Sequence, residues 1–218
     1  MAIGETSAQM SLRDPDIRLM LRVRDDDPKA FSELVETFQV RLVSVLSHIL
    51  RSAEEAEDLA QEVFLRVYRH RKKYRPTAKF STWIFTIANN LALNALRNKQ
   101  HKQHIALNMA DSGPLGPRPV EHLVHAPNAA PSTNLQHAEL AARIQQALDK
   151  LNERQKMAVV LNKFEEMNYA EIAEVMSLSV KAVKSLLSRA RARLREELQA
   201  YIYMDGEVVP HLAAGDEA

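Results

Sequence analysis

The chain has 218 residues, of which 46% are hydrophobic and 26% are charged, and its formal net charge is +1. These values fit a folded protein with one or two modest cores and exclude a chain that is disordered throughout. Cysteine is absent, which excludes disulfides and thiolate metal sites and fits a reducing cytosol. No apolar run has membrane-spanning length and no signal-peptide pattern opens the chain, so we expect a cytoplasmic protein without membrane insertion.

The first half of the chain predicts a helical lobe. Apolar residues recur at three- and four-residue steps from Phe31 to Ile49, which predicts a core helix. Ser52 and Glu55 have the spacing of a capping box and open a second helix. The exposed positions of this second helix are acidic first and basic afterwards. That order suits the helix dipole, but the dipole does not explain why so many charged residues are present.

A third helix follows Pro76, with Ser81 predicted as its cap. Its apolar stripe predicts burial, whereas a second, polar-rimmed face combines one aromatic, two amides and a cation: Trp83, Asn90, Asn94 and Arg97. Unpaired bases offer a flat surface for stacking and edges for hydrogen bonds, which such a face matches. Trp83 taken singly could equally be a core residue. Two asparagines on one mid-helix face indicate a functional role and not a stabilising one, because asparagine prefers helix caps.

The segment from His101 to Gln136 contains five of the nine prolines and two of the five glycines. This content excludes one long helix or a central strand and predicts a linker or a functional loop. Two His-x-x-His pairs, at 101 and 104 and at 122 and 125, raise the alternative of a metal site, but no cluster of carboxylates accompanies them. We expect no metal, no cofactor and no enzyme activity, since the nucleophile and phosphate-loop motifs of enzymes are absent as well.

The stretch from Asn168 to Arg195 predicts a helix-turn-helix. Asn168 and Glu171 form a capping pair, a short turn runs from Ser177 to Ser179, and Ser179 is placed to cap the second helix. That second helix has one apolar stripe and one exposed face of cations and hydroxyls: Lys181, Lys184, Ser185, Ser188 and Arg189. Such a face suits phosphates and base edges in the DNA major groove. The alternative is a solvated amphipathic helix in a bundle.

Together, EDLAQEVFLRVYRHRKKY, FSTWIFTIANNLALNALRNK and the helix-turn-helix beyond a proline-rich linker resemble bacterial RNA polymerase sigma factors of the extracytoplasmic function group. The resemblance implies an all-α chain of two small helical domains joined by an extended proline-rich linker. A sigma-two domain is expected at 14–100, the linker at 101–136, a sigma-four domain at 137–200 and a tail at 201–218. Core RNA polymerase, promoter DNA and an anti-sigma factor are the implied partners.

Residue roles carry over from the family by position. Asp58, Gln61 and Glu62 match positions that bind core polymerase. Arg75, Lys79, Trp83, Asn90, Asn94 and Arg97 match positions around the minus-ten element, and the exposed face of the helix-turn-helix matches the minus-thirty-five readers. Asn94 replaces the Asp of many members and Leu186 replaces an Arg of some, so no relative's promoter sequence can be transferred. A helix-turn-helix regulator that is not a sigma subunit is the alternative.

Overall fold

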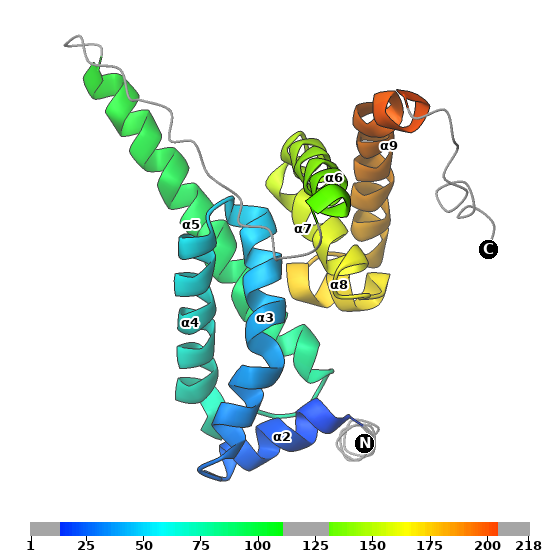
Figure 1. The fold of residues 1–218 in the computed structure, drawn as a ribbon. Helices are drawn as coiled ribbons and strands as arrows, with labels where there is room; N and C mark the ends of the chain where they lie inside the picture. Colours follow the sequence, from blue (N-terminus) through cyan, green and yellow to red (C-terminus); the bar gives the residue numbers. More distant parts are fainter. Residues whose placement is uncertain (1–13, 111–130, 205–218) are drawn as a thin grey trace.

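The computed structural model describes residues 14–110 and 131–204. Every regular element within these ranges is a helix, which confirms the predicted all-α class. Figure 1 shows the order along the chain. The first domain contains α2 (Pro15–Arg24), α3 (Ala30–Leu50), α4 (Ala53–His70), the short 3₁₀ helix η1 (Arg71–Lys73) and α5 (Phe80–Ala110); the second contains α6 (Pro131–Asp149), α7 (Glu153–Lys163), α8 (Tyr169–Met176) and α9 (Val180–Met204).

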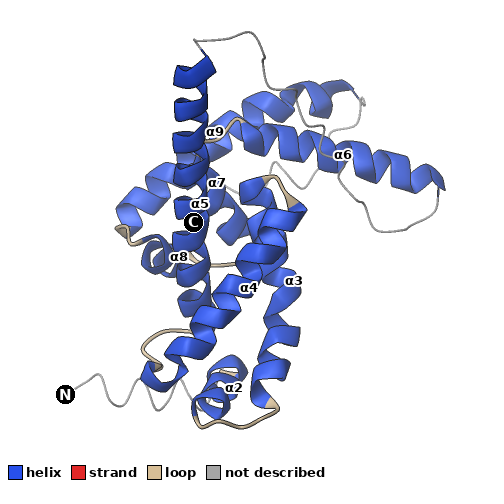
Figure 2. Cartoon of the chain, turned by 90° about the vertical axis from the view of Figure 1, so that its left-hand side faces the viewer, coloured by secondary structure: helices blue, strands red, loops and turns tan. Residues whose placement is uncertain are grey.

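The core of the first domain is built around α3, which lies beside α4 in both views (Figures 1 and 2). The stripe predicted on α3 is buried, with Leu34, Phe38 and Leu42 fully inaccessible to solvent. Phe38 meets Phe80 of α5 edge to face, with ring centroids 5.1 Å apart. Burying this apolar face, rather than helix propensity, supplies most of the stability of such helices. The packing leaves the acidic face of α4 and one face of α5 toward solvent.

The predicted boundaries of the third helix differ from the observed ones at both ends. The helix α5 begins at Phe80, so Ser81 lies inside it and is not the cap; the backbone N–H of Trp83 donates to the carbonyl of Lys79 at 3.3 Å. Because Phe80 is buried against α3, the helix begins two residues earlier than it would with Ser81 as its cap. The helix also continues past residue 100, because residues 101–110 contain neither proline nor glycine.

Only half of the capping box predicted at the start of α4 forms. The Ser52 hydroxyl accepts from the backbone N–H of Glu55 at 3.2 Å, as predicted. The Glu55 carboxylate does not return a bond to Ser52, because it accepts from the Lys99 ammonium of α5 at 3.1 Å instead. A contact between helices has therefore replaced a local one.

The second domain packs α7, α8 and α9 around Leu161, Ile172, Val183 and Leu187, all buried. The predicted capping box on α8 forms completely: the Asn168 side chain accepts from the Glu171 backbone, and the Glu171 carboxylate accepts from the Asn168 backbone. On α8, Ile172 and Val175 are fully buried and Met176 is half-buried.

We expect Asn168→Ala to lower the free energy of unfolding of the second domain by about 1 kcal/mol, since the variant loses the bonds that the Asn168 side chain accepts from the backbone N–H groups of Ala170 and Glu171. Urea denaturation followed by circular dichroism measures this loss. Asn152, which caps α7 through the same reciprocal pattern, provides a matched variant, Asn152→Ala, with an expected loss of the same order. A change within error of zero at Asn168 would contradict the stabilising role of this cap.

Candidate nucleic-acid interface

The turn between α8 and α9 fixes the angle of the helix-turn-helix. Ser177 adopts a left-handed conformation at φ 53°, and its backbone N–H donates to the carbonyls of Ala173 and Glu174. The Ser179 hydroxyl accepts from the backbone N–H of Ala182 at 3.2 Å, which is the predicted cap of α9. These bonds satisfy the ends of both helices and hold α9 with one face toward solvent.

The basic face predicted on α9 is exposed, with Ser185 half-buried within it. The Arg189 guanidinium donates to the Ser185 hydroxyl at 2.7 Å. Two residues that were each predicted to contact DNA are therefore bonded to each other. Ser185 therefore orients the guanidinium, a group that can form two hydrogen bonds at once to the major-groove edge of a guanine. The flanking Arg191 donates to the Tyr169 hydroxyl at 3.2 Å and ties α9 to α8.

A shallow hollow of about 400 Å³ lies along this face, and the sequence reasoning missed one cation that lines it. Arg154, in the first turn of α7, borders the hollow together with Lys181, Ser185 and Arg189. A cation at a helix N-terminus opposes the helix dipole, so its position there does not serve helix stability. That electrostatic conflict is the signal that could have identified Arg154 from the sequence.

The predicted face of α5 is present in the structure. Asn90, Asn94 and Arg97 are exposed along it, while the neighbouring Asn89 is buried. Trp83 is half-buried at the head of the face and packs against Tyr74 and Phe80, with ring centroids at 5.0 and 5.8 Å. The two readings of Trp83 left open by the sequence thus both hold in part: one side is anchored in an aromatic cluster, and the ring remains partly accessible.

Two other cations predicted near the minus-ten element precede α5. Arg75 is exposed. Lys79 is also exposed, but its ammonium lies 2.7 Å from the Glu171 carboxylate of α8 in the other domain. This hydrogen bond raises the pKa of Lys79. Lys79 must exchange Glu171 for another anion before it can contact a phosphate.

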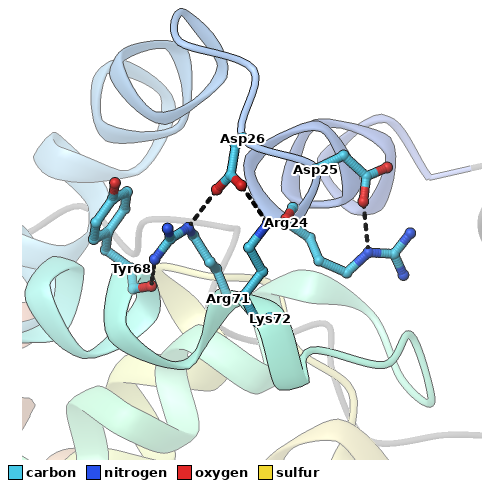
Figure 3. Close-up of polar contacts among 6 residues, drawn as sticks. All are labelled: Arg24, Asp25, Asp26, Tyr68, Arg71 and Lys72. Atoms are coloured by element: carbon cyan, nitrogen blue, oxygen red, sulfur yellow. Dashed lines mark hydrogen bonds and ion pairs between the residues drawn. The ribbon is translucent and has the colours of Figure 1, made fainter.

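The basic run that follows α4 has a structural use that the sequence did not reveal (Figure 3). Asp26, in the turn between α2 and α3, pairs with Arg71 at 3.0 Å and with the Lys72 ammonium. Lys72 also donates to the carbonyl of Arg24 at 2.7 Å, and the Arg71 guanidinium lies 4.0 Å from the ring centre of Tyr68. Bonds from Lys72 and Arg71 lower the pKa of Asp26. These cations join α2 to the end of α4.

The predicted polymerase-binding residues lie together on α4. Asp58 and Gln61 are exposed and Glu62 is half-buried. Glu62 accepts from Arg66 at 2.8 Å, and this bond lowers the pKa of the Glu62 carboxyl. Leu65, 48% exposed, follows one turn later on the same side of the helix, so the surface combines acid with an apolar centre that was not predicted.

That apolar centre continues into a hollow of about 300 Å³ at the end of the domain. Leu65 and Tyr68 of α4 border it together with Phe31 of α3, whose ring lies 5.0 Å from that of Tyr68. Exposed aromatic and aliphatic groups beside charged ones are typical of protein interfaces.

No group of three or more His, Asp or Glu among the described residues is placed to hold a metal ion. His101 is exposed on α5, and the side chains of His104, His122 and His125 lie outside the described part. Within the described ranges, no helix is both long and apolar enough to cross a membrane.

Comparison with known proteins agrees with this geometry. Residues 34–102 match the family described as Sigma-70 region 2, and residues 141–194 match Sigma-70, region 4. The chain is 30% identical over 178 residues to the ECF RNA polymerase sigma factor SigW of Bacillus subtilis, with 82% of this chain and 94% of SigW covered. Two solved structures share the fold: CnrH bound to the cytosolic domain of CnrY (TM-score 0.61, 24% identity, 86% and 99% coverage) and the sigma factor RpoE of Bartonella quintana bound to the anti-sigma factor NepR (TM-score 0.59, 22% identity, 78% and 98% coverage).

The chain belongs to the sigma-70 family, in its extracytoplasmic function group. The protein is therefore a sigma factor, and the alternative of a helix-turn-helix regulator acting apart from polymerase is not favoured.

Proposed function

We propose that this sigma factor acts in the cytoplasm, where its first domain binds core RNA polymerase and the minus-ten element and its second domain reads the minus-thirty-five element. The polymerase supplies the catalysis and this chain supplies promoter recognition. The observation that carries the proposal is the separation of chemistry between the domains: an aromatic and amide face on α5, suited to unpaired bases, and a cation and hydroxyl face on α9, suited to the major groove.

In the first domain, Asp58, Gln61, Glu62 and the adjoining Leu65 would contact a basic and apolar surface of the polymerase. Charges at such a surface govern encounter and register, while the apolar centre contributes affinity. Trp83 and Asn90 would hold a base extruded from the minus-ten element, since stacking and amide bonds become available only once the base leaves the duplex. Asn94 and the cations Arg75, Lys79 and Arg97 would contact the surrounding strands.

In the second domain, Lys184 and Arg189 would read base edges, with Ser185 orienting Arg189 and Lys181 and Ser188 contributing from the same exposed face. Arg154 would add a phosphate contact. We also propose that an anti-sigma factor regulates this chain. The structure of RpoE with the anti-sigma factor NepR, whose fold this chain shares, supports that proposal.

Transcription by purified core polymerase on a promoter library tests the function and separates base readers from positioning residues. We expect the parent to direct initiation from one class of promoter. Lys184→Ala or Arg189→Ala should relax preference at one or two positions of the upstream element, at a cost of roughly 1 to 3 kcal/mol.

The exposed Arg193 flanks the face and provides the matched control. Arg193→Ala should weaken binding to all promoters alike and lower the salt slope by about one unit, with preference unchanged. One upstream motif shared by the parent and all three variants would refute the assignment of the readers, and absence of promoter-specific initiation by the parent would refute the function.

A further inference from the structure

An exposed apolar side chain lies beside the cations and hydroxyls at the start of α9. Val180 is the first residue of that helix and is 41% exposed, whereas Val183 and Leu187 of the same helix are buried. It directly follows Ser179, whose hydroxyl caps α9 by accepting from the backbone N–H of Ala182. Val180 therefore belongs to the outer surface of the helix-turn-helix and not to the core of the second domain.

Helix stability does not account for a valine at this position. A β-branched side chain loses rotamer freedom in a helix and is less favourable there than alanine, lysine or glutamate. The first turn of a helix also favours acidic groups, which complement the helix dipole, and a valine adds nothing to that effect. The reason for Val180 therefore lies outside the helix that it opens.

The position of Val180 suggests that reason. Single exposed apolar residues are common on protein surfaces, and Val40 of α3 is one of them. Val180 differs from Val40 because it stands at the N-terminus of the second helix of a helix-turn-helix, and the residues at that end contact base edges in the major groove.

The spacing along α9 relates Val180 to a residue assigned above to a base edge. Val180 and the exposed Lys184 are four residues apart, so they are neighbours on the helix surface, with Cβ atoms about 5 to 6 Å apart. Successive bases along one strand are separated by about 3.4 Å. Val180 would therefore meet a base one or two steps from the base that Lys184 contacts.

The chemistry of the major groove selects the base. The hydrocarbon side chain of valine offers no hydrogen bond, so a polar base edge placed against it would lose water without gaining a partner. Thymine alone among the four bases presents an apolar group in the major groove, its C5-methyl. Burial of one group of this size corresponds to about a fourfold change in affinity.

We propose that Val180 is a specificity-determining residue that contacts the C5-methyl of one thymine in the minus-thirty-five element, one or two base pairs from the base contacted by Lys184. This proposal rests on the proposed function, because it requires α9 to enter the major groove of that element. It assigns one base of the element by its chemistry.

Replacing each thymine of the selected upstream element in turn by deoxyuridine tests the contact. Deoxyuridine keeps the hydrogen-bonding groups of thymine and lacks only the methyl. At one position it should weaken binding of the full chain with core polymerase about fourfold, measured by competition binding to duplex promoters. Val180→Ala should weaken binding to the thymine promoter by the same factor. That variant should show no further loss on deoxyuridine at that position, since either change removes the same contact.

Two further variants serve as controls. Val180→Ile retains an apolar side chain and should keep the preference for thymine over deoxyuridine. Val40→Ala makes the same truncation at an exposed valine of the first domain and should behave like the parent. Circular dichroism should show α9 folded in Val180→Ala, because alanine is the better helix former.

The possible failures of the contact and of the proposed function are distinct. Three outcomes would overturn the contact while leaving the proposed function intact: losses from Val180→Ala and deoxyuridine that add at every position, no effect of deoxyuridine on the parent, or a selected upstream motif without thymine. If the parent with core polymerase selects no upstream motif at all, the proposed function is refuted and the contact with it.

Discussion

Asn90→Ala is expected to lower the rate of open-complex formation roughly ten- to a hundredfold, the range that corresponds to losing one base-specific set of hydrogen bonds. Binding to the closed, double-stranded promoter should change much less, because the Asn90 amide would bond a base only after extrusion. The exposure of Asn90 on α5 means that the substitution removes no core contact. Permanganate footprinting of the melted region, together with filter binding to duplex promoter, measures the two steps separately.

A promoter with a pre-melted bubble provides the decisive control. It should partly restore activity to Asn90→Ala without restoring preference for the extruded base. Gln39→Ala, which removes an exposed amide from α3, should behave like the parent in both assays. Equal performance of Asn90→Ala and the parent on duplex promoters would remove Asn90 from the site. Trp83→Ala is a poorer test, because Trp83 also packs against Tyr74 and Phe80 and its loss would disturb the fold.

Charge reversal of Asp58 and Glu62 to lysine is expected to weaken binding to core polymerase roughly ten- to a hundredfold, with a reduced dependence on salt. Both residues lie on the solvent side of α4, whose opposite side is anchored by Ala56, Ala60 and Val63. The helix should therefore remain folded while the electrostatic match to a basic partner is lost. Fluorescence anisotropy titration of labelled protein with core polymerase measures the affinity, and circular dichroism checks the fold.

The bond between Glu62 and Arg66 requires a specific control. Reversing Glu62 places a lysine one turn from Arg66, a repulsion that acts on the helix itself. Asp58→Lys alone avoids this repulsion and should still show a clear loss of affinity. Reversal of two exposed acids at the far end of α9, Glu196 and Glu197, changes the net charge equally and should leave core affinity unaltered. Core binding by Asp58→Lys with Glu62→Lys at the parent's affinity would refute this surface.

The features that the sequence by itself determined are local ones. The cap of α8 is an example, because Asn168 and Glu171 are three residues apart and helical geometry brings them together. The exposed faces of α5 and α9 followed from the same periodicity, since burying one apolar stripe commits the opposite residues to solvent. The order of the two domains could be predicted because each carries its own motif.

The contacts that only the tertiary structure decided join residues far apart in the chain. Nothing local pairs Arg41 with Glu165, or Asp26 with Arg71 and Lys72, so the sequence left the excess of basic residues after α4 unexplained. Glu55 bonds to Lys99 and not to the backbone of Ser52, as its predicted cap required. Phe80 packs on Phe38, and α5 begins before Ser81. A long charged side chain can reach several hydrogen-bond partners that are close to it in the sequence. The packing of the helices decides which bond forms, because it brings a group from a distant part of the chain within hydrogen-bond distance.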